Sequence, residues 1–293
     1  MWSLIALGAA LLTSFNPILY KRILKHASPV SAVWGVTLLA LPLLGISSLA
    51  LSSAIPQLDA IFWLALLGSA LLNAFAHLAS TQAIKIEEVS LVTPLLSFAP
   101  VFTLLIGALF LGEIPSMRGL LGVLLVLSGA YWLGRKPGSR WFAPISGLEF
   151  RPGMAFALLA GSLWSITPLL EKIAIQHTAP QSPRIVAAAS NALLVLLLSP
   201  VVMYGGKQSI AGLVLHKREL LLAVLIAGTA PLLGYSALQL GYVGYVTTLF
   251  KFSTVLTVVW GALLLGETGF SRRLPAATIM VLGGILIAVQ TID

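Results

Sequence analysis

The stretch GALFLGE at residues 107–113 returns as GALLLGE at residues 261–267. A second pair of matching stretches lies upstream, NPILYK at residues 16–21 and TPLLEK at residues 167–172. Both pairs are displaced by about half of the 293-residue chain, and the shared positions include glycines, prolines and charges as well as leucines. This agreement predicts that the chain consists of two copies of one unit.

The composition indicates that the solvent of this protein is lipid. Apolar residues make up 58% of the chain and charged residues only 9%, whereas a soluble domain carries about 25% charged residues. The mean hydropathy is +1.01. Because a lipid-exposed backbone must satisfy its own hydrogen bonds, apolar runs of this length are expected to be helices. The sequence therefore predicts an all-α integral membrane protein.

The apolar runs define ten expected transmembrane helices, five in each copy. They cover about residues 2–20, 30–51, 60–83, 89–111, 117–134, 153–175, 185–204, 219–240, 245–265 and 275–291. We expect a first five-helix repeat at 1–134, a connecting loop at 135–152 and a second repeat at 153–293. Because five is an odd number, the second copy must enter the membrane in the opposite sense. Such inverted repeats are common in secondary transporters, with the substrate site between the copies.

The basic residues predict the orientation. Most of them fall in alternate loops, and the other side holds only Arg118, Lys172 and Arg184. Since cytoplasmic loops carry the excess of Lys and Arg, both termini are expected outside, in a bacterial cytoplasmic (inner) membrane. The same bias accounts for the net charge of +8, so no nucleic-acid partner is expected.

The GALFLGE and GALLLGE stretches, together with Pro17 and Pro168 in the first helix of each copy, make the chain resemble the drug/metabolite transporter superfamily in its EamA-type form. The resemblance covers essentially the whole chain. It implies a ten-helix transporter of metabolites such as amino acids, sugars or nucleotide sugars, often an exporter or an exchanger. It also implies cytoplasmic termini, which is the opposite of what the charges predict.

Lys251 is the foremost candidate for substrate binding. It follows YVTTLF at residues 245–250 and resembles a lysine in the ninth helix of the phosphate- and nucleotide-sugar-carrying branch. That branch often has a second cation where this chain has Phe252, so the substrate branch stays open. Intramembrane charges usually face a cavity or a partner. Lys251 is expected either to hold an anionic group or to extend its ammonium to the membrane interface.

Three polar residues of the third helix are spaced four apart and share one face, Asn73, His77 and Thr81. They are expected either to line a cavity or to hydrogen-bond to neighbouring helices. Two aromatic residues, Trp164 and Tyr235, are further candidates for ligand contact, with helix packing as the alternative.

Asn16 and Thr167 each precede a repeat-related proline, Pro17 or Pro168. Proline removes a backbone donor, so we expect two kinked helices that face each other and either bind solute, bend during gating or serve only as structural kinks.

Three glutamates stand near helix ends. Glu113 and Glu267 are expected to cap the following helix or to pair with arginines (Arg118 and Arg272), with a gating role as the alternative. Glu171 and Lys172 are expected to neutralise each other at the membrane edge.

Other classes of function lack their motifs. The sequence has no Walker pattern, no nucleophile with a plausible base and no cluster with metal-ligand spacing, so neither an enzyme nor a cofactor or metal is expected. The first helix has no buried glutamate, which disfavours multidrug proton antiport.

We expect a secondary transporter or exchanger, in the export direction, of small polar metabolites such as amino acids or organic anions. It would work by alternating access as a monomer or homodimer, with a coupling proton or counter-substrate. A passive pore and a sugar-phosphate or nucleotide-sugar exchanger are the alternatives.

Overall fold

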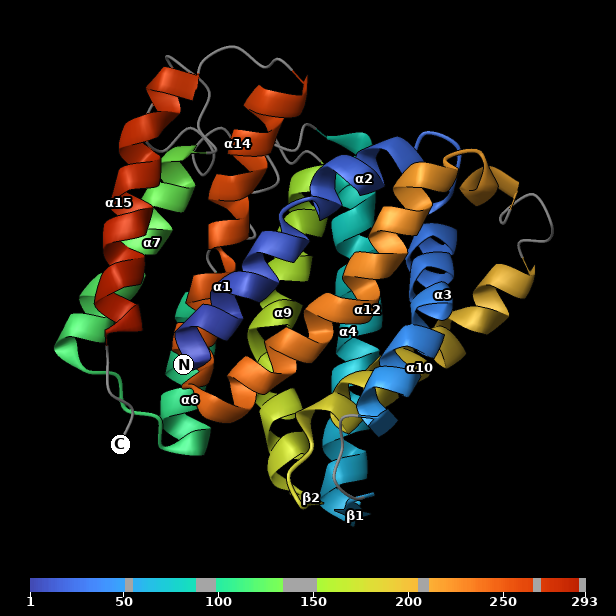
Figure 1. Ribbon diagram of the computed structural model, residues 1–293, viewed down its shortest axis with the longest axis horizontal. Helices are drawn as coiled ribbons and strands as arrows, with labels where there is room; N and C mark the ends of the chain where they lie inside the picture. Colours follow the sequence, from blue (N-terminus) through green and yellow to red (C-terminus); the bar gives the residue numbers. More distant parts are fainter. Residues whose placement is uncertain (51–54, 88–98, 134–151, 205–210, 266–269, 290–293) are drawn as a thin grey trace.

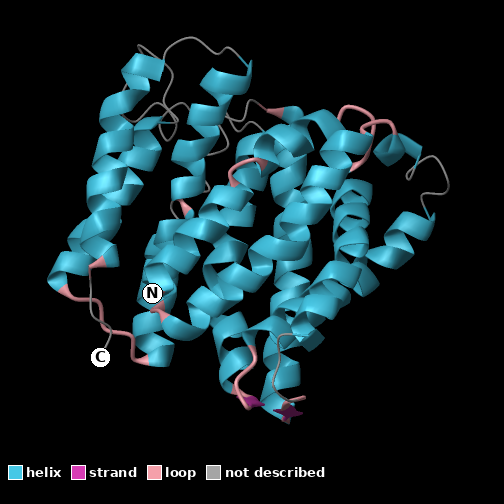
Figure 2. Ribbon diagram, in the orientation of Figure 1, coloured by secondary structure: helices cyan, strands magenta, loops and turns pink. Residues whose placement is uncertain are grey.

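The protein is a bundle of helices accompanied by two very short strands (Figures 1 and 2). The structure, a computed structural model, describes residues 1–50, 55–87, 99–133, 152–204, 211–265 and 270–289. The first half of the chain supplies α1 (Trp2–Thr13), α2 (Asn16–Ile23), α3 (Pro29–Ala50), β1 (Gln57–Leu58), α4 (Ala60–Ile86), α6 (Ala99–Leu111) and α7 (Met117–Leu133). The second half supplies α9 (Pro152–Gln176), β2 (Thr178–Ala179), α10 (Pro183–Tyr204), α12 (Lys217–Leu240), α13 (Val243–Phe250), α14 (Phe252–Leu265) and α15 (Phe270–Ala288).

Within the described residues, six helices are long and apolar enough to cross a membrane. They are Trp2–Ile23, Pro29–Ala50, Ala60–Ile86, Pro152–Gln176, Pro183–Tyr204 and Lys217–Leu240. Shorter apolar helices cover Phe102–Leu111, Met117–Gly129 and Thr278–Ile287. Large apolar side chains point away from the protein along these helices, for example Leu64 and Phe75 on α4. Because a soluble protein rarely exposes such surfaces, this chain is an integral membrane protein.

Two of the expected helices are broken. The first divides at Ser14 and Phe15 into α1 and α2, because Pro17 has no N–H and its ring crowds the preceding turn. The ninth divides at Lys251 into α13 and α14. The sixth does not break, since α9 continues through Pro168. The expected kinks are therefore not equivalent in the two halves.

The helices pair reciprocally between the halves. α1 packs mainly against α12, and α9, which corresponds to α1, packs mainly against α4, which corresponds to α12. The second helices of the halves, α3 and α10, pack against each other, as do the fifth helices, α7 and α15 (Figure 1). Two repeats related by a twofold axis produce this pattern. The proline-bearing helices α1 and α9 thus pack chiefly on other helices, and that they face each other stays a prediction.

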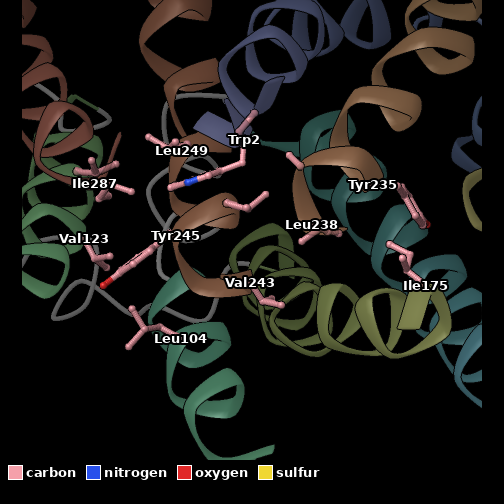
Figure 3. Close-up of a cluster of buried hydrophobic side chains, with 14 of the residues drawn as sticks. Trp2, Leu104, Val123, Ile175, Tyr235, Leu238, Val243, Tyr245, Leu249 and Ile287 are labelled. Atoms are coloured by element: carbon pink, nitrogen blue, oxygen red, sulfur yellow. The ribbon is translucent and has the colours of Figure 1, made fainter. Parts of the chain in front are cut away.

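The largest apolar core lies between the halves. Its buried residues come from α1, α4, α6, α7, α9, α10 and α12 to α15. Figure 3 shows Tyr235 beside Ile175 at one end of this core and Val123 beside Ile287 at the other. Tyr245 is 2% exposed inside this core, and its hydroxyl accepts a hydrogen bond from the Ser116 amide at 2.9 Å.

The described helix ends divide between two sides of the bundle. In Figure 1, α1 begins and α15 ends toward the lower side, where β1 and β2 pair, whereas α2, α4, α7 and α14 end toward the upper side. The exposed basic residues Lys21 and Arg22 near the end of α2, and Lys217 and Arg218 at the start of α12, lie toward the upper side. We name the two sides the basic end and the strand end.

Candidate functional site

Glu171 is the centre of a buried polar cluster between α9, α4 and α12. Its carboxylate oxygen Oε1 accepts hydrogen bonds from Asn73 Nδ2 at 2.8 Å and from Ser69 Oγ at 3.1 Å. The buried Tyr235 of α12 lies next to this carboxylate. Three helices from both halves of the chain thus meet at one carboxyl group.

Lys172 does not neutralise Glu171, contrary to the expectation from sequence. Consecutive residues of a helix point in different directions, so the two side chains cannot face each other. The ammonium of Lys172 pairs instead with Glu113 Oε1 and donates to the Gly241 carbonyl at 2.6 Å. Both charged side chains are about nine-tenths buried. Glu171 therefore has no cationic partner among the residues that the structure describes.

Glu113 joins three separate segments through its two carboxylate oxygens. One oxygen pairs with Lys172 of α9, and the other accepts from the Val243 amide at 2.5 Å, which satisfies a free donor at the start of α13. The expected pairing with Arg118 is wrong, and the helix that Glu113 caps is α13 rather than the next helix along the chain. We refer to Glu113, Lys172, Gly241 and Val243 as the buried latch.

Gly112 explains how Glu113 turns into the protein. Its φ is +67°, in the left-handed region that glycine adopts without strain, and it follows directly after the last residue of α6. This turn ends the helix and redirects the chain, so the next side chain points back under α6. The Gly-Glu pair is thus a turn followed by a buried anion.

His77 and Trp164 lie deeper in the same α4–α9 interface. Their rings meet edge to face, with centroids 5.3 Å apart and an interplanar angle of 80°. The third polar residue of the α4 stripe behaves differently, because the Thr81 hydroxyl bonds to the His77 carbonyl of its own helix at 2.7 Å. The structure therefore groups Asn73, His77, Trp164 and Tyr235 around the α4–α9 interface and leaves Thr81 out.

The break in the first helix forms a separate contact. The Ser14 carbonyl accepts from Thr257 Oγ1 at 2.6 Å, and the Ser14 hydroxyl accepts from Trp260 Nε1 at 2.9 Å. Phe15 stacks on Trp260, with the ring centroids 4.9 Å apart. Asn16 begins α2 just beyond this contact. The break is thus held by α14 of the other half.

The remaining candidates lie away from this interface. Lys251 is partly exposed where α13 passes into α14, and its amide donates to the Thr248 carbonyl at 3.0 Å. Glu267, the counterpart of Glu113, lies outside the described residues, as does Ser97, the counterpart of Lys251. No group of three His, Asp or Glu side chains in the described part of the chain is placed to hold a metal ion.

The cluster and the latch offer two kinds of chemistry. The Glu171 carboxyl, surrounded by neutral donors, can hold a proton or a cationic group, whereas the latch can open and close by separating two charges. Neither the Glu171 cluster nor the latch was predicted from the sequence, because Glu171 and Lys172 were expected to neutralise each other. The rule that adjacent helical residues do not face each other would have shown that each needs a separate partner.

Comparison with known proteins places the chain in a family. The sequence profile of the EamA-like transporter family matches residues 1–135 and 151–290. No curated protein sequence matches the chain. Among solved structures 28 chains match. One, a crystal structure, has a TM-score of 0.74 and 19% sequence identity, and the alignment covers 98% of each chain. At this identity the likeness concerns the fold alone.

Proposed function

Because the chain belongs to the EamA-like transporter family, we propose that it is a secondary transporter that carries small polar metabolites, such as amino acids or organic anions, by alternating access. In this proposal ten transmembrane helices form two inverted five-helix repeats, at 1–134 and 153–293. The reciprocal packing of α1 on α12 and of α9 on α4 supports the inverted arrangement.

The observation that carries the proposal is the difference between the two ends of the bundle. At the strand end the buried latch ties both halves of the chain together with charges that are about nine-tenths buried. The crevice beside it has no space for a water molecule and is lined by Leu104, Glu113, Pro115, Tyr242, Gly244 and Tyr245. In this proposal the strand end is the closed end of the solute path.

The basic end has related contacts, but they are exposed. Lys21, the repeat counterpart of Lys172, donates to the Ile84 carbonyl at 2.7 Å and to the Glu87 carbonyl at 3.2 Å, at the end of α4. Lys172 makes the equivalent bond to Gly241 at the end of α12. One lysine is buried and the other is exposed. Such an asymmetry is expected of a carrier that closes one side at a time, and a passive pore does not need it.

The test is exchange in liposomes that contain the purified protein. Vesicles loaded with one unlabelled solute from a panel of amino acids, organic acids and phosphates are expected to take up the same labelled solute by counterflow. Ohmic current through the protein, without counterflow, would indicate the passive pore. Counterflow of phosphate esters alone would indicate the sugar-phosphate exchanger.

Lys251 separates two substrate classes within this proposal. If Lys251 holds an anionic group, then Lys251→Ala abolishes exchange of organic anions and spares that of neutral amino acids. Equal effects on both classes would assign Lys251 to the membrane interface.

Export across a bacterial inner membrane, with the basic end in the cytoplasm and both termini outside, is part of the same proposal. The chain has no cysteine, so single cysteines report their side directly. An impermeant maleimide added to intact cells is expected to label Gln181→Cys, near the strand end, and not Lys217→Cys, at the basic end. The reverse labelling would place the termini inside.

A further inference from the structure

We propose that Glu171 is the site at which this transporter takes up and releases a coupling proton, an inference that rests on the transport function proposed above. The first helix has no carboxyl side chain, but α9, its counterpart in the second half, has a buried one. The position that corresponds to Glu171 in the first half is Tyr20. Of these two equivalent positions, only the one in the second half carries a carboxyl group.

The surroundings of Glu171 suit a group that changes its protonation state. The residue is 8% exposed, and it lies five residues before the end of α9, which is about 8 Å along the helix axis. An ionised carboxyl taken out of water is costly unless a cation pairs with it, and binding a proton removes the charge. Among the described residues its hydrogen-bond partners are Ser69 and Asn73, and Tyr235 lies next to it; all three are neutral.

The charged and titratable groups of the neighbouring elements are engaged elsewhere. Lys172 and Glu113 pair with each other. Asp59, just before α4, pairs with His177, just after α9, at 2.7 Å. On α4, His77 contacts Trp164, seven residues from Glu171 along α9. Arg184 of α10 already interacts with another group, and the Tyr245 hydroxyl of α13 accepts a hydrogen bond from the Ser116 amide. Tyr235 of α12 is the titratable group that touches Glu171.

The hydrogen bonds allow a proton to be gained without rebuilding the site. The ionised carboxylate accepts from Ser69 and Asn73. A proton from water on one side of the membrane adds to a carboxylate oxygen, and the new O–H donates to the Ser69 oxygen once that hydroxyl has rotated. Release to water on the other side reverses this step, so one proton crosses per cycle and no bond other than O–H changes.

The cluster is also placed to couple proton binding to conformation. Asn73 and Ser69 come from α4 of the first half, whereas Tyr235 and Glu171 come from the second half. The next residue along α9, Lys172, belongs to the buried latch. A change in the hydrogen bonds of Glu171 therefore acts on the contact between the halves, one residue away from the latch that closes the strand end.

The first test needs no substrate. Infrared difference spectra of the purified protein over a pH titration are expected to show the C=O band of a buried carboxylic acid, which disappears as the group ionises. Glu171→Gln should abolish this band, and Glu219→Gln, which alters a carboxyl at the edge of the basic end, should retain it. An unchanged band in Glu171→Gln overturns the proposal. Melting curves verify that the Glu171→Gln variant is folded.

The second test uses the liposome exchange assay, with the panel solute that gives counterflow as the probe. A pH gradient is expected to drive accumulation of that solute by the wild-type protein. Glu171→Gln should lose this accumulation while exchange without a gradient persists, and Glu171→Asp should restore part of it. Equal pH-driven accumulation by wild type and Glu171→Gln would refute the proton site and leave the transport function standing. Absence of counterflow in the wild type would refute the transport function, and the infrared result would still decide the proton site.

Discussion

Separating the charges of the buried latch is the sharpest perturbation that the structure suggests. Lys172→Met leaves the Glu113 carboxylate buried without its cation, and Glu113→Gln leaves the Lys172 ammonium without its anion. Removal of one partner of a buried ion pair costs about 3–5 kcal/mol. Both side chains are about nine-tenths buried, so each single substitution is expected to fall in that range.

The double variant is expected to be more stable than either single variant. Gln at position 113 keeps an oxygen that can accept from the Val243 amide, and Met at position 172 loses mainly the bond to the Gly241 carbonyl. A lost hydrogen bond of this kind costs about 1–2 kcal/mol. The coupling energy between the two positions should therefore exceed about 2 kcal/mol.

The assay is reversible unfolding in mixed micelles with increasing sodium dodecyl sulfate, followed by tryptophan fluorescence. The exposed pair of Arg22 and Glu219, joined at 3.1 Å, serves as the matched control, with Arg22→Met and Glu219→Gln in a second cycle. An exposed pair contributes at most about 1 kcal/mol. If the coupling energy of the latch were as small as that of the control pair, the two charges would not be buried together, and the closure of the strand end would lose its basis.

Three further predictions concern packing, pH and the break in the first helix. A Cβ at Gly122 would lie 2.7 Å from the Gly283 carbonyl oxygen, so Gly122→Ala should separate α7 from α15 and destabilise the protein by about 1–3 kcal/mol. The control Gly45→Ala, with nothing within 4 Å, should lose no stability in the same unfolding assay; equal losses would contradict the close packing. The amide of Phe62, and then His177, hold the pKa of Asp59 below its ordinary value. A lowered pKa stabilises the fold above the unfolded-state pKa, and this stabilisation is lost as pH falls through the folded value. Asp59→Asn should therefore lower the melting temperature at neutral pH and have no effect in acid, whereas a constant difference across pH would rule out the charge as the cause. Trp260→Phe keeps an aromatic ring but removes the N–H that donates to the Ser14 hydroxyl at the helix break, and a loss of at least about 1 kcal/mol in the free energy of unfolding is expected; wild-type stability would show that this bond contributes nothing.

Hydropathy and the internal duplication were sufficient to predict the class of the protein, a helical membrane protein built from two repeats. Apolar runs of about 20 residues require helices in a bilayer, because no water is available to satisfy an open backbone. The matching glycines, prolines and charges predicted the family, which the sequence profile confirms over both halves. The exact number of ten spans stays a prediction, since the described residues contain six long apolar helices and several shorter ones.

The partners of the charged residues could not be predicted from hydropathy or from the duplication. Pro17 and Pro168 each predicted a kink in its own helix. Of these two helices, only the first is broken. Whether a proline breaks a helix also depends on the contacts that the backbone finds at the break, and here Thr257 of α14 donates to the Ser14 carbonyl. Such contacts join residues far apart along the chain, so local sequence does not specify them.

By itself, then, the sequence determined a duplicated, helical membrane protein, because composition and periodicity act locally along the chain. Only the tertiary structure decided that Glu113 pairs with Lys172 and that Glu171 is left among neutral donors. The direction of a helical side chain follows from its position in the turn, but the partner that it meets depends on which helix packs there. The latch and the proposed proton site both arise from that packing.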